Sequence, residues 1–141
     1  MVRFRHLLAV HLAFKKQVLS GLKDYKLMPG HPKILHFIRF NEGCQQNYIA
    51  QNCYIESATL SGVLSNMEKR GLIERKSSET DGRAYRVFLT DKSRPICDAV
   101  IRQFDETESL ALSGFSEEEK DELEKYLIRI ENNLNSLAEG K

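Results

Sequence analysis

The segment 45-QQNYIAQNCYIESATLSGVLSNMEKRGLIERKSSETDGRAYRVFLT-90 decides the fold, and its first part predicts a short helix over Gln46–Asn52. Ile49 and Ala50 are the inward residues of this helix. Residues 53–55 then form a tight connection to the next element. The segment is therefore expected to begin with two helices in close succession.

A second, amphipathic helix is expected over residues 56–70. Its apolar residues recur at spacings of three and four, as one face of a helix requires: Leu60, Val63, Leu64 and Met67. Gly71 should end the helix, because glycine readily adopts the positive φ found at helix C-termini.

The period of the sequence then changes to that of a β-hairpin. Residues 72–76 and Tyr85–Leu89 predict two short strands, the second rich in aromatic and branched side chains. The polar residues between them include Asp81-Gly82, which favours a turn. Two helices joined by a tight turn and followed by a hairpin form a winged helix-turn-helix, whose second helix would enter the major groove of DNA.

The run 49-IAQNCYIESATLSGVLSNMEKRGLIER-75, with the later DGR and FLTDK, resembles the DNA-binding core of the MarR family of transcription regulators. The resemblance rests on positions that match the family pattern without a gap: Ile49, Ala50, Thr59, Ser61, the run 67–75, Asp81-Gly82-Arg83 and Leu89-Thr90. It implies a mainly α fold of about six helices with a small β-hairpin wing, an α+β winged helix-turn-helix in one domain over residues 1–141. Residues 28–92 would be the DNA-binding core, and the helices in 1–27 and 93–141 would form a dimerisation lobe.

The face of the second helix opposite its apolar residues predicts the side chains that read DNA. Short hydroxyl and amide groups hydrogen-bond base edges, and an alanine methyl packs on thymine. The candidates are Ser57, Ala58, Thr59, Ser61, Gly62, Ser65, Asn66 and Lys69. Gly62 stands where the family often has arginine, and Glu56 where a Ser or Asp cap is usual. We therefore expect modest direct readout, with DNA shape and backbone contacts supplying much of the affinity.

The wing supplies further candidates for DNA contact. In the family the Arg of the D-x-R tip enters the minor groove and the Asp helps to hold it, roles that the resemblance gives to Arg83 and Asp81. Candidates for phosphate contacts are Lys69, Arg75, Lys76 and Arg86. Arg75 could instead pair with Glu74 or Asp81.

Charge is segregated along the chain, although the formal net charge is only +1. Residues 69–94 carry 8 Lys and Arg against 4 Asp and Glu, whereas residues 105–141 carry 4 against 11. Exposed charges more than about 10 Å apart are largely screened at 0.1 M salt. The positive excess near the wing therefore matters more to a bound duplex than the distant acidic segment.

The sequence on either side of the core segment predicts the remaining helices. Residues 3–20 form a helix that is apolar on more than one face, which indicates burial by a partner as well as by its own core. Pro32 opens an apolar helix that ends at residues 41–43. Thr90 is a good N-cap for the next helix. The inward face of that helix is expected to run through Ile96, Val100, Ile101, Phe104 and Ala111.

The last helix begins at a capping box formed by Ser116 and Glu119. Its apolar residues recur at spacings of 4, 3, 4 and 3, which is a heptad seam: Leu123, Leu127, Ile130, Leu134 and Leu137. The seam favours a homodimer, and packing of the helix on its own domain is the alternative. The resemblance implies a dimer interface made by the first, fifth and sixth helices.

Control by a small-molecule effector is common in the MarR family. His11 and His36 lie on expected apolar helix faces and are candidates to bind an effector, with satisfied core histidines as the alternative. No cofactor is expected, and the histidines lack the paired spacing of a metal site. Cys53 and Cys97 are expected to be buried, which leaves Cys44 as the candidate reactive thiol.

The sequence shows no signal peptide, no long apolar run and no C-x-x-C pair, which favours a cytoplasmic protein without membrane contact. It also lacks the nucleophile–base pair, phosphate loop or metal cluster of an enzyme. We expect a sequence-specific regulator of transcription, a ligand-responsive repressor that binds a pseudo-palindromic operator in double-stranded DNA as a homodimer. The alternative is a winged-helix adaptor that binds proteins.

Overall fold

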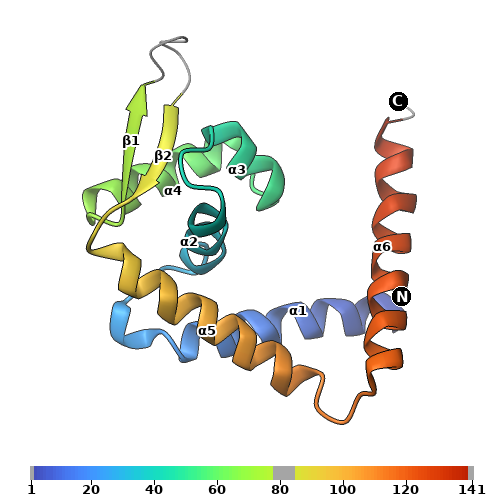
Figure 1. The fold of residues 1–141 in the computed structure, drawn as a ribbon. Helices are drawn as coiled ribbons and strands as arrows, with labels where there is room; N and C mark the ends of the chain where they lie inside the picture. Colours follow the sequence, from blue (N-terminus) through green and yellow to red (C-terminus); the bar gives the residue numbers. More distant parts are fainter. Residues whose placement is uncertain (1, 78–84, 140–141) are drawn as a thin grey trace. The chain divides into compact units, whose positions relative to one another are not determined.

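The computed structural model describes residues 2–77 and 85–139 (Figure 1). Asp81 and Arg83 lie outside the described residues. The elements follow the order α1 (Val2–Ser20), η1 (Lys23–Tyr25), α2 (His31–Phe40), α3 (Gln46–Asn52), α4 (Ser57–Lys69), β1 (Ile73–Ser77), β2 (Tyr85–Leu89), α5 (Ser93–Ala111) and α6 (Glu117–Glu139). This order confirms the mainly α winged helix-turn-helix. The chain divides into two compact units, residues 1–107 and 108–141.

The helix-turn-helix forms where the sequence predicts it. Helix α3 has the expected bounds, and Ile49 and Ala50 are buried. Helix α4 is shorter by one residue at each end than the expected 56–70, because Glu56 and Arg70 are its caps. Gly71 follows with a φ of 73°, a left-handed conformation that costs glycine no steric energy.

The wing is a two-stranded antiparallel sheet in which Ile73 pairs with Leu89 and Ser77 with Tyr85. Strand β1 begins one residue later than expected, and β2 has the predicted bounds. Ile73, Val87 and Leu89 are buried. The hairpin therefore packs its inner face on the helices while its outer face stays open.

The core of residues 1–107 is built on α2 and α4. Ile34, Leu35 and Ile38 of α2 are fully buried, as are Leu60, Leu64 and Met67 of α4. Burying one such side chain contributes about 1.5–3 kcal/mol to folding. On α2, Phe40 is 64% exposed. Successive helical residues turn by about 100°, which places Phe40 on the side away from Ile34.

Helix α5 starts from a reciprocal cap. The Ser93 N–H donates to Thr90 Oγ1 at 3.2 Å, and the Thr90 N–H donates to Ser93 Oγ at 3.1 Å, which confirms Thr90 as the cap. Cys97, Val100 and Thr107 are buried. Ala111 is exposed, so the expectation that it continues the inward face was wrong. The buried positions of α5 end one helical turn earlier, at Thr107.

The unit 108–141 contains α6, which opens with the predicted capping box. The Ser116 N–H donates to Glu119 Oε2 at 2.9 Å, and the Glu119 N–H donates to Ser116 Oγ at 3.1 Å. The heptad seam is exposed along its length, from 37% at Leu123 to 70% at Leu137. Among the described residues, neither α6 nor any other helix is long and apolar enough to cross a membrane.

Candidate nucleic-acid interface

The exposed side of α4 carries the residues that the sequence predicts to read DNA. Ser61 and Ser65 are half-buried, and the other predicted members of the set are exposed: Ser57, Ala58, Thr59, Gly62, Asn66 and Lys69. The fully buried Leu60, Leu64 and Met67 hold the opposite side of the helix against the core. The amphipathic pattern thus fixes which side of α4 faces outward.

The start of α4 is weakly capped. Glu56 occupies the N-cap position with extended backbone angles (φ −59°, ψ 138°), and its side chain makes no capping hydrogen bond within the described part of the chain. The first N–H groups of a helix lack intrahelical partners and carry a partial positive charge. They are therefore open to an outside acceptor.

Gly62 leaves an open space at the middle of the exposed side. A Cβ built on Gly62 would meet no atom within 4 Å among the residues that the structure describes. The glycine is therefore not required for packing against another described helix of the same chain.

Arg75 is held by α4 through Glu68 rather than by the expected Glu74, and the other expected partner, Asp81, lies outside the described residues. Arg75 Nη2 donates to Glu68 Oε1 at 3.2 Å and to Ser65 Oγ at 3.0 Å, while the Arg75 N–H donates to Glu68 Oε2 at 3.0 Å. Ser65 Oγ in turn donates to the Ser61 carbonyl at 3.0 Å. Arg75 and Ser65 thus brace the wing against α4, and Arg75 Nη2 and Ser65 Oγ already have protein partners.

The other basic candidates lie on the hairpin and at the end of α4. Lys76 Nζ is 3.9 Å from Glu74 Oε2 and lies 4.8 Å from the centroid of the Phe88 ring. Arg86 Nη1 donates to the Gly43 carbonyl at 2.9 Å. Lys69 is exposed in the last turn of α4. The structure thus brings together α4 and the basic strand residues on adjacent elements.

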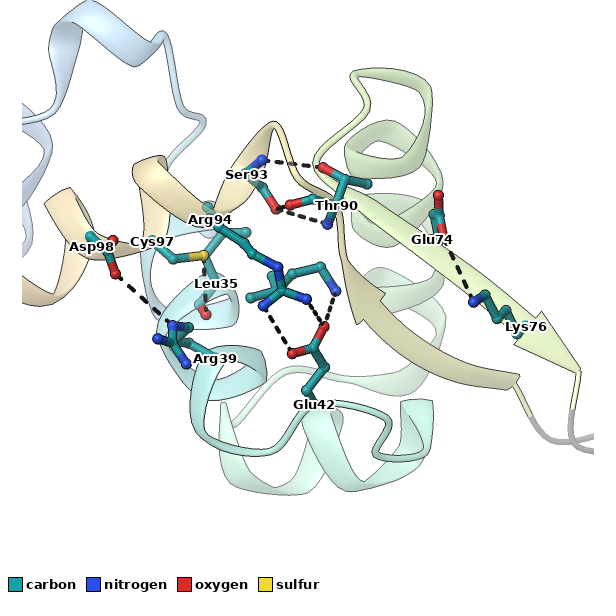
Figure 2. Close-up of polar contacts among 11 residues, drawn as sticks. Leu35, Arg39, Glu42, Glu74, Lys76, Thr90, Ser93, Arg94, Cys97 and Asp98 are labelled. Carbon is teal, nitrogen blue, oxygen red and sulfur yellow. Dashed lines mark hydrogen bonds and ion pairs between the residues drawn. The ribbon is translucent and has the colours of Figure 1, made fainter.

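A polar junction at the base of the wing was not predicted from the sequence (Figure 2). Arg94 donates through Nη2 and Nη1 to Oε1 and Oε2 of Glu42, at 2.7 and 3.2 Å. The Leu89 N–H donates to Glu42 Oε1 at 3.2 Å. The hydrogen bond from Arg94 is the main reason that the pKa of Glu42 is lowered. The junction joins the loop after α2, the end of β2 and the first turn of α5.

The predicted effector residues His11 and His36 line one groove of about 520 Å³ within residues 1–107. The His36 ring packs on Phe40 and Phe104, with centroids 5.2 and 5.1 Å away. Burial lowers the pKa of His36. His11 is exposed at the groove rather than buried in the core. The full lining comprises His11, Lys33, His36, Phe37, Asn52, Cys53, Tyr54 and Phe104.

The cysteines are free thiols with burial as predicted. Cys53 and Cys97 are buried, and burial raises the pKa of each to about 11. Cys44 is half-buried, and burial raises its pKa as well. Because the thiolate is the reactive form, this environment opposes reactivity at Cys44. In the described part of the chain, no three His, Cys, Asp or Glu residues converge as a metal site.

Known proteins that this chain resembles belong to the MarR family. A family model described as "MarR family" matches residues 27–84. A regulator of this family from Listeria monocytogenes, solved with a 26-mer DNA, is 26% identical, with a TM-score of 0.88 over 93% of this chain and 87% of that one. The repressor CouR, solved on a 23-mer duplex, is 25% identical, with a TM-score of 0.78 over 89% of each chain.

A protein from Peptoclostridium difficile shows the same fold at lower identity. It is a MarR protein that is 22% identical to this chain, with a TM-score of 0.91 over 100% of this chain and 93% of that one. The likeness therefore extends beyond the winged helix-turn-helix to the flanking helices.

Proposed function

Because the chain belongs to the MarR family of transcription regulators, we propose that it binds specific double-stranded DNA and represses transcription. The observation that carries the proposal is the exposed polar side of α4, held outward by three fully buried residues on its other side. A helix presented in this way fits the major groove. Two similar proteins of the family were solved on DNA duplexes, which supports a regulator over a protein-binding adaptor.

The proposed reading of DNA combines weak base contacts with strong backbone contacts. Ser57, Ala58, Thr59 and Asn66 would meet base edges, and Lys69, Lys76 and Arg86 would contact phosphates. Ser61 and Ser65 lie deeper on the same side. We propose that Arg75 supports DNA binding indirectly, by holding the wing against α4, because its guanidinium is already bonded to Glu68. Gly62 would allow the duplex to approach the backbone of α4 closely.

The proposed operator is a pseudo-palindrome bound by a homodimer. Helices in residues 1–27 and 93–141 would supply the dimerisation lobe, and residues 28–92 the DNA-binding core. The exposed seam of α6 supports this division, because an apolar stripe of heptad spacing is the usual signature of a helix that pairs with another helix. The two α4 helices would enter successive major grooves about 34–36 Å apart.

We further propose that a small-molecule effector binds the groove at His11 and His36 and releases the DNA. The groove combines aromatic walls with imidazole and ammonium groups from His11, His36 and Lys33, which suits an aromatic anion. We propose that the protein acts by binding DNA and not as an enzyme, since its relatives are regulators of transcription. We place the protein in the cytoplasm because a regulator acts where the DNA is.

The direct test is selection from a pool of randomised duplexes at several salt concentrations, followed by sequencing of the retained DNA. We expect enrichment of an inverted repeat, with affinity falling steeply as salt rises, because phosphate contacts release counterions. Weak binding without sequence preference would contradict the proposal and favour the adaptor.

The wing tip offers a second test of the proposal. Arg83→Ala should weaken operator binding about tenfold or more, since a guanidinium in a narrow minor groove would be lost. The dimer and its thermal unfolding should not change. Fluorescence anisotropy with the selected operator measures the first effect, and Lys141→Ala serves as a charge-matched control. Unchanged affinity of Arg83→Ala would remove the wing tip from the mechanism.

A further inference from the structure

Arg70, the residue that caps the C-terminal end of α4, makes a set of contacts that the proposed function does not use. Its guanidinium points away from the DNA-reading side and reaches the corner between α1 and α2. Arg70 Nη2 donates to the Lys26 carbonyl at 2.8 Å and to the Tyr25 carbonyl at 3.4 Å. Carbonyls at the end of a short helix such as η1 lack intrahelical donors, so a guanidinium satisfies them well.

The third contact of the guanidinium is with His31, the first residue of α2. Arg70 Nη1 lies 3.4 Å from His31 Nδ1, and the Met28 N–H lies 3.2 Å from the same nitrogen. A backbone N–H can only donate, so Nδ1 must be the acceptor and the proton of the neutral ring must be on Nε2. His31 is 2% exposed, and burial and Arg70 lower its pKa to about 4. His31 is therefore neutral near pH 7 and accepts from Arg70 without charge repulsion.

The backbone at the same position is tied to the start of α5. Lys92 Nζ donates to the Arg70 carbonyl at 2.8 Å, and Thr90 Oγ1 donates to the Gly71 carbonyl at 2.6 Å. The end of α4 is thus bonded on one side to the chain that follows α1 and on the other to the chain that leads into α5.

We propose that Arg70 is a positioning residue that sets the angle of α4 relative to the corner after α1 and the start of α5, and thereby the spacing of half-sites that the dimer accepts. The inference rests on the proposed function, because the spacing matters only if α1 and α5 carry the DNA-binding core of a dimer. Each contact lies within residues 1–107. A rigid joint permits one separation of the two α4 helices, whereas a loose joint permits several.

The test compares binding to a series of operators whose half-sites are moved together or apart by one and two base pairs. The unmodified protein should prefer one spacing. Arg70→Met, which keeps the bulk and removes the donors, should reduce that preference about tenfold, the factor expected when a charged hydrogen bond is lost. Arg70→Lys should give an intermediate preference, because an ammonium can bond one of the carbonyls but cannot span the set.

Two controls separate positioning from general stability. Ile38→Val loosens the core without touching Arg70 and should leave the preferred spacing unchanged. Lys92→Met releases only the side facing α5 and should weaken the preference partly. If Arg70→Met does not fold, Arg70→Lys and Lys92→Met carry the same test.

The outcomes are distinguishable. A uniform loss of affinity across all spacings in the Arg70 variants would overturn the positioning role while leaving the proposed function intact. An unmodified protein that selects no repeat would overturn both. A flattened profile in the Arg70 variants alone, with Ile38→Val unchanged, would support the inference.

Discussion

Helices α4 and α6 have the same kind of apolar stripe but opposite surroundings. Leu60, Leu64 and Met67 of α4 are fully buried, whereas Leu127 and Leu134 of α6 are 44% and 59% exposed in the single chain. Helix α4 contacts α3 and β1, and its buried residues share one core cluster with those of α2. The periodicity of a sequence identifies the apolar face of a helix, and it does not identify what covers that face.

The contrast extends to the two units as wholes. The core cluster lies entirely within residues 1–107, and residues 108–137 contain no buried side chain. An exposed apolar stripe in water is unfavourable by about 25 cal/mol for each Å² left uncovered. The cover for the apolar stripe of α6 is expected from a second copy of the chain.

Charges on the seam of α6 should abolish dimerisation. The double variant Leu127→Asp and Ile130→Asp places two carboxylates in the proposed interface, where they would be desolvated without partners. Sedimentation equilibrium should show a monomer, and operator affinity should fall by about 100-fold or more through lost avidity. Asn132→Asp, on the face of α6 opposite the seam, should leave both properties unchanged. A double variant that remains a dimer would show that α6 is covered in another way.

Truncation of one leucine in α4 and one in α6 should distinguish burial within a single chain from burial between two chains. Leu64→Ala should lower the free energy of unfolding by about 2–5 kcal/mol at any protein concentration, because it leaves a cavity in the core of the single chain. Leu127→Ala should have an effect that varies with concentration, since its contacts form between chains. Urea denaturation at two concentrations measures both. Equal, concentration-independent losses would contradict the contrast.

Acid should lower the free energy of unfolding of residues 1–107, the unit that buries His31. The pKa of His31 is about 4 in the folded chain and ordinarily 6.5, so between these values the unfolded chain binds a proton that the folded chain does not. The free energy of unfolding should therefore fall as the pH drops from 6.5 towards 4, by at most about 1.4 kcal/mol per pH unit. Urea midpoints at pH 7 and 5 test this, and His31→Gln should flatten the slope. A His31 ring that titrates near 6.5 by NMR would rule out the effect.

The smallest effect is expected at the N-terminal ends of α4 and α6. Here the exposed helix is the one with the better local contacts. The exposed helix α6 has a complete capping box, and the buried helix α4 begins at Glu56 without a side-chain cap among the described residues. Glu56→Ser should raise the free energy of unfolding by about 0.5–1 kcal/mol and remove a carboxylate near the proposed phosphates. Thermal unfolding measures the gain, and Ser116→Ala should show a loss of similar size in α6. No change in Glu56→Ser would show that the start of α4 is already satisfied.

The elements that local sequence could predict are the ones whose determinants lie within a few residues. The bounds of α3 and β2, the cap at Thr90 and the capping box at Ser116 all follow from near neighbours. The pairs that were missed join residues far apart in the chain. Glu42 meets Arg94, and Arg70 meets Tyr25, Lys26 and His31, because the folded core brings them together.

In the candidate site, too, features set by nearby residues were predictable and long-range pairs were not. The outward side of α4 follows from its apolar spacing, whereas the partner of Arg75 among the described residues is Glu68 and not the expected Glu74. Glu68 takes that role because β1 crosses beside the last turns of α4, a tertiary arrangement that no local pattern describes. Which basic side chains remain available to DNA is therefore decided by the fold.

The open space above Gly62 has a consequence for how such a regulator could diverge. A new side chain at this position would meet nothing within 4 Å in the described chain and would project from the side of α4 that we propose enters the major groove of DNA. A glycine codon needs one nucleotide change to encode arginine, a residue able to bond guanine through two donors. Operator preference can therefore be rewritten in duplicated genes by single mutations at position 62, without any compensating change in the interior of the protein.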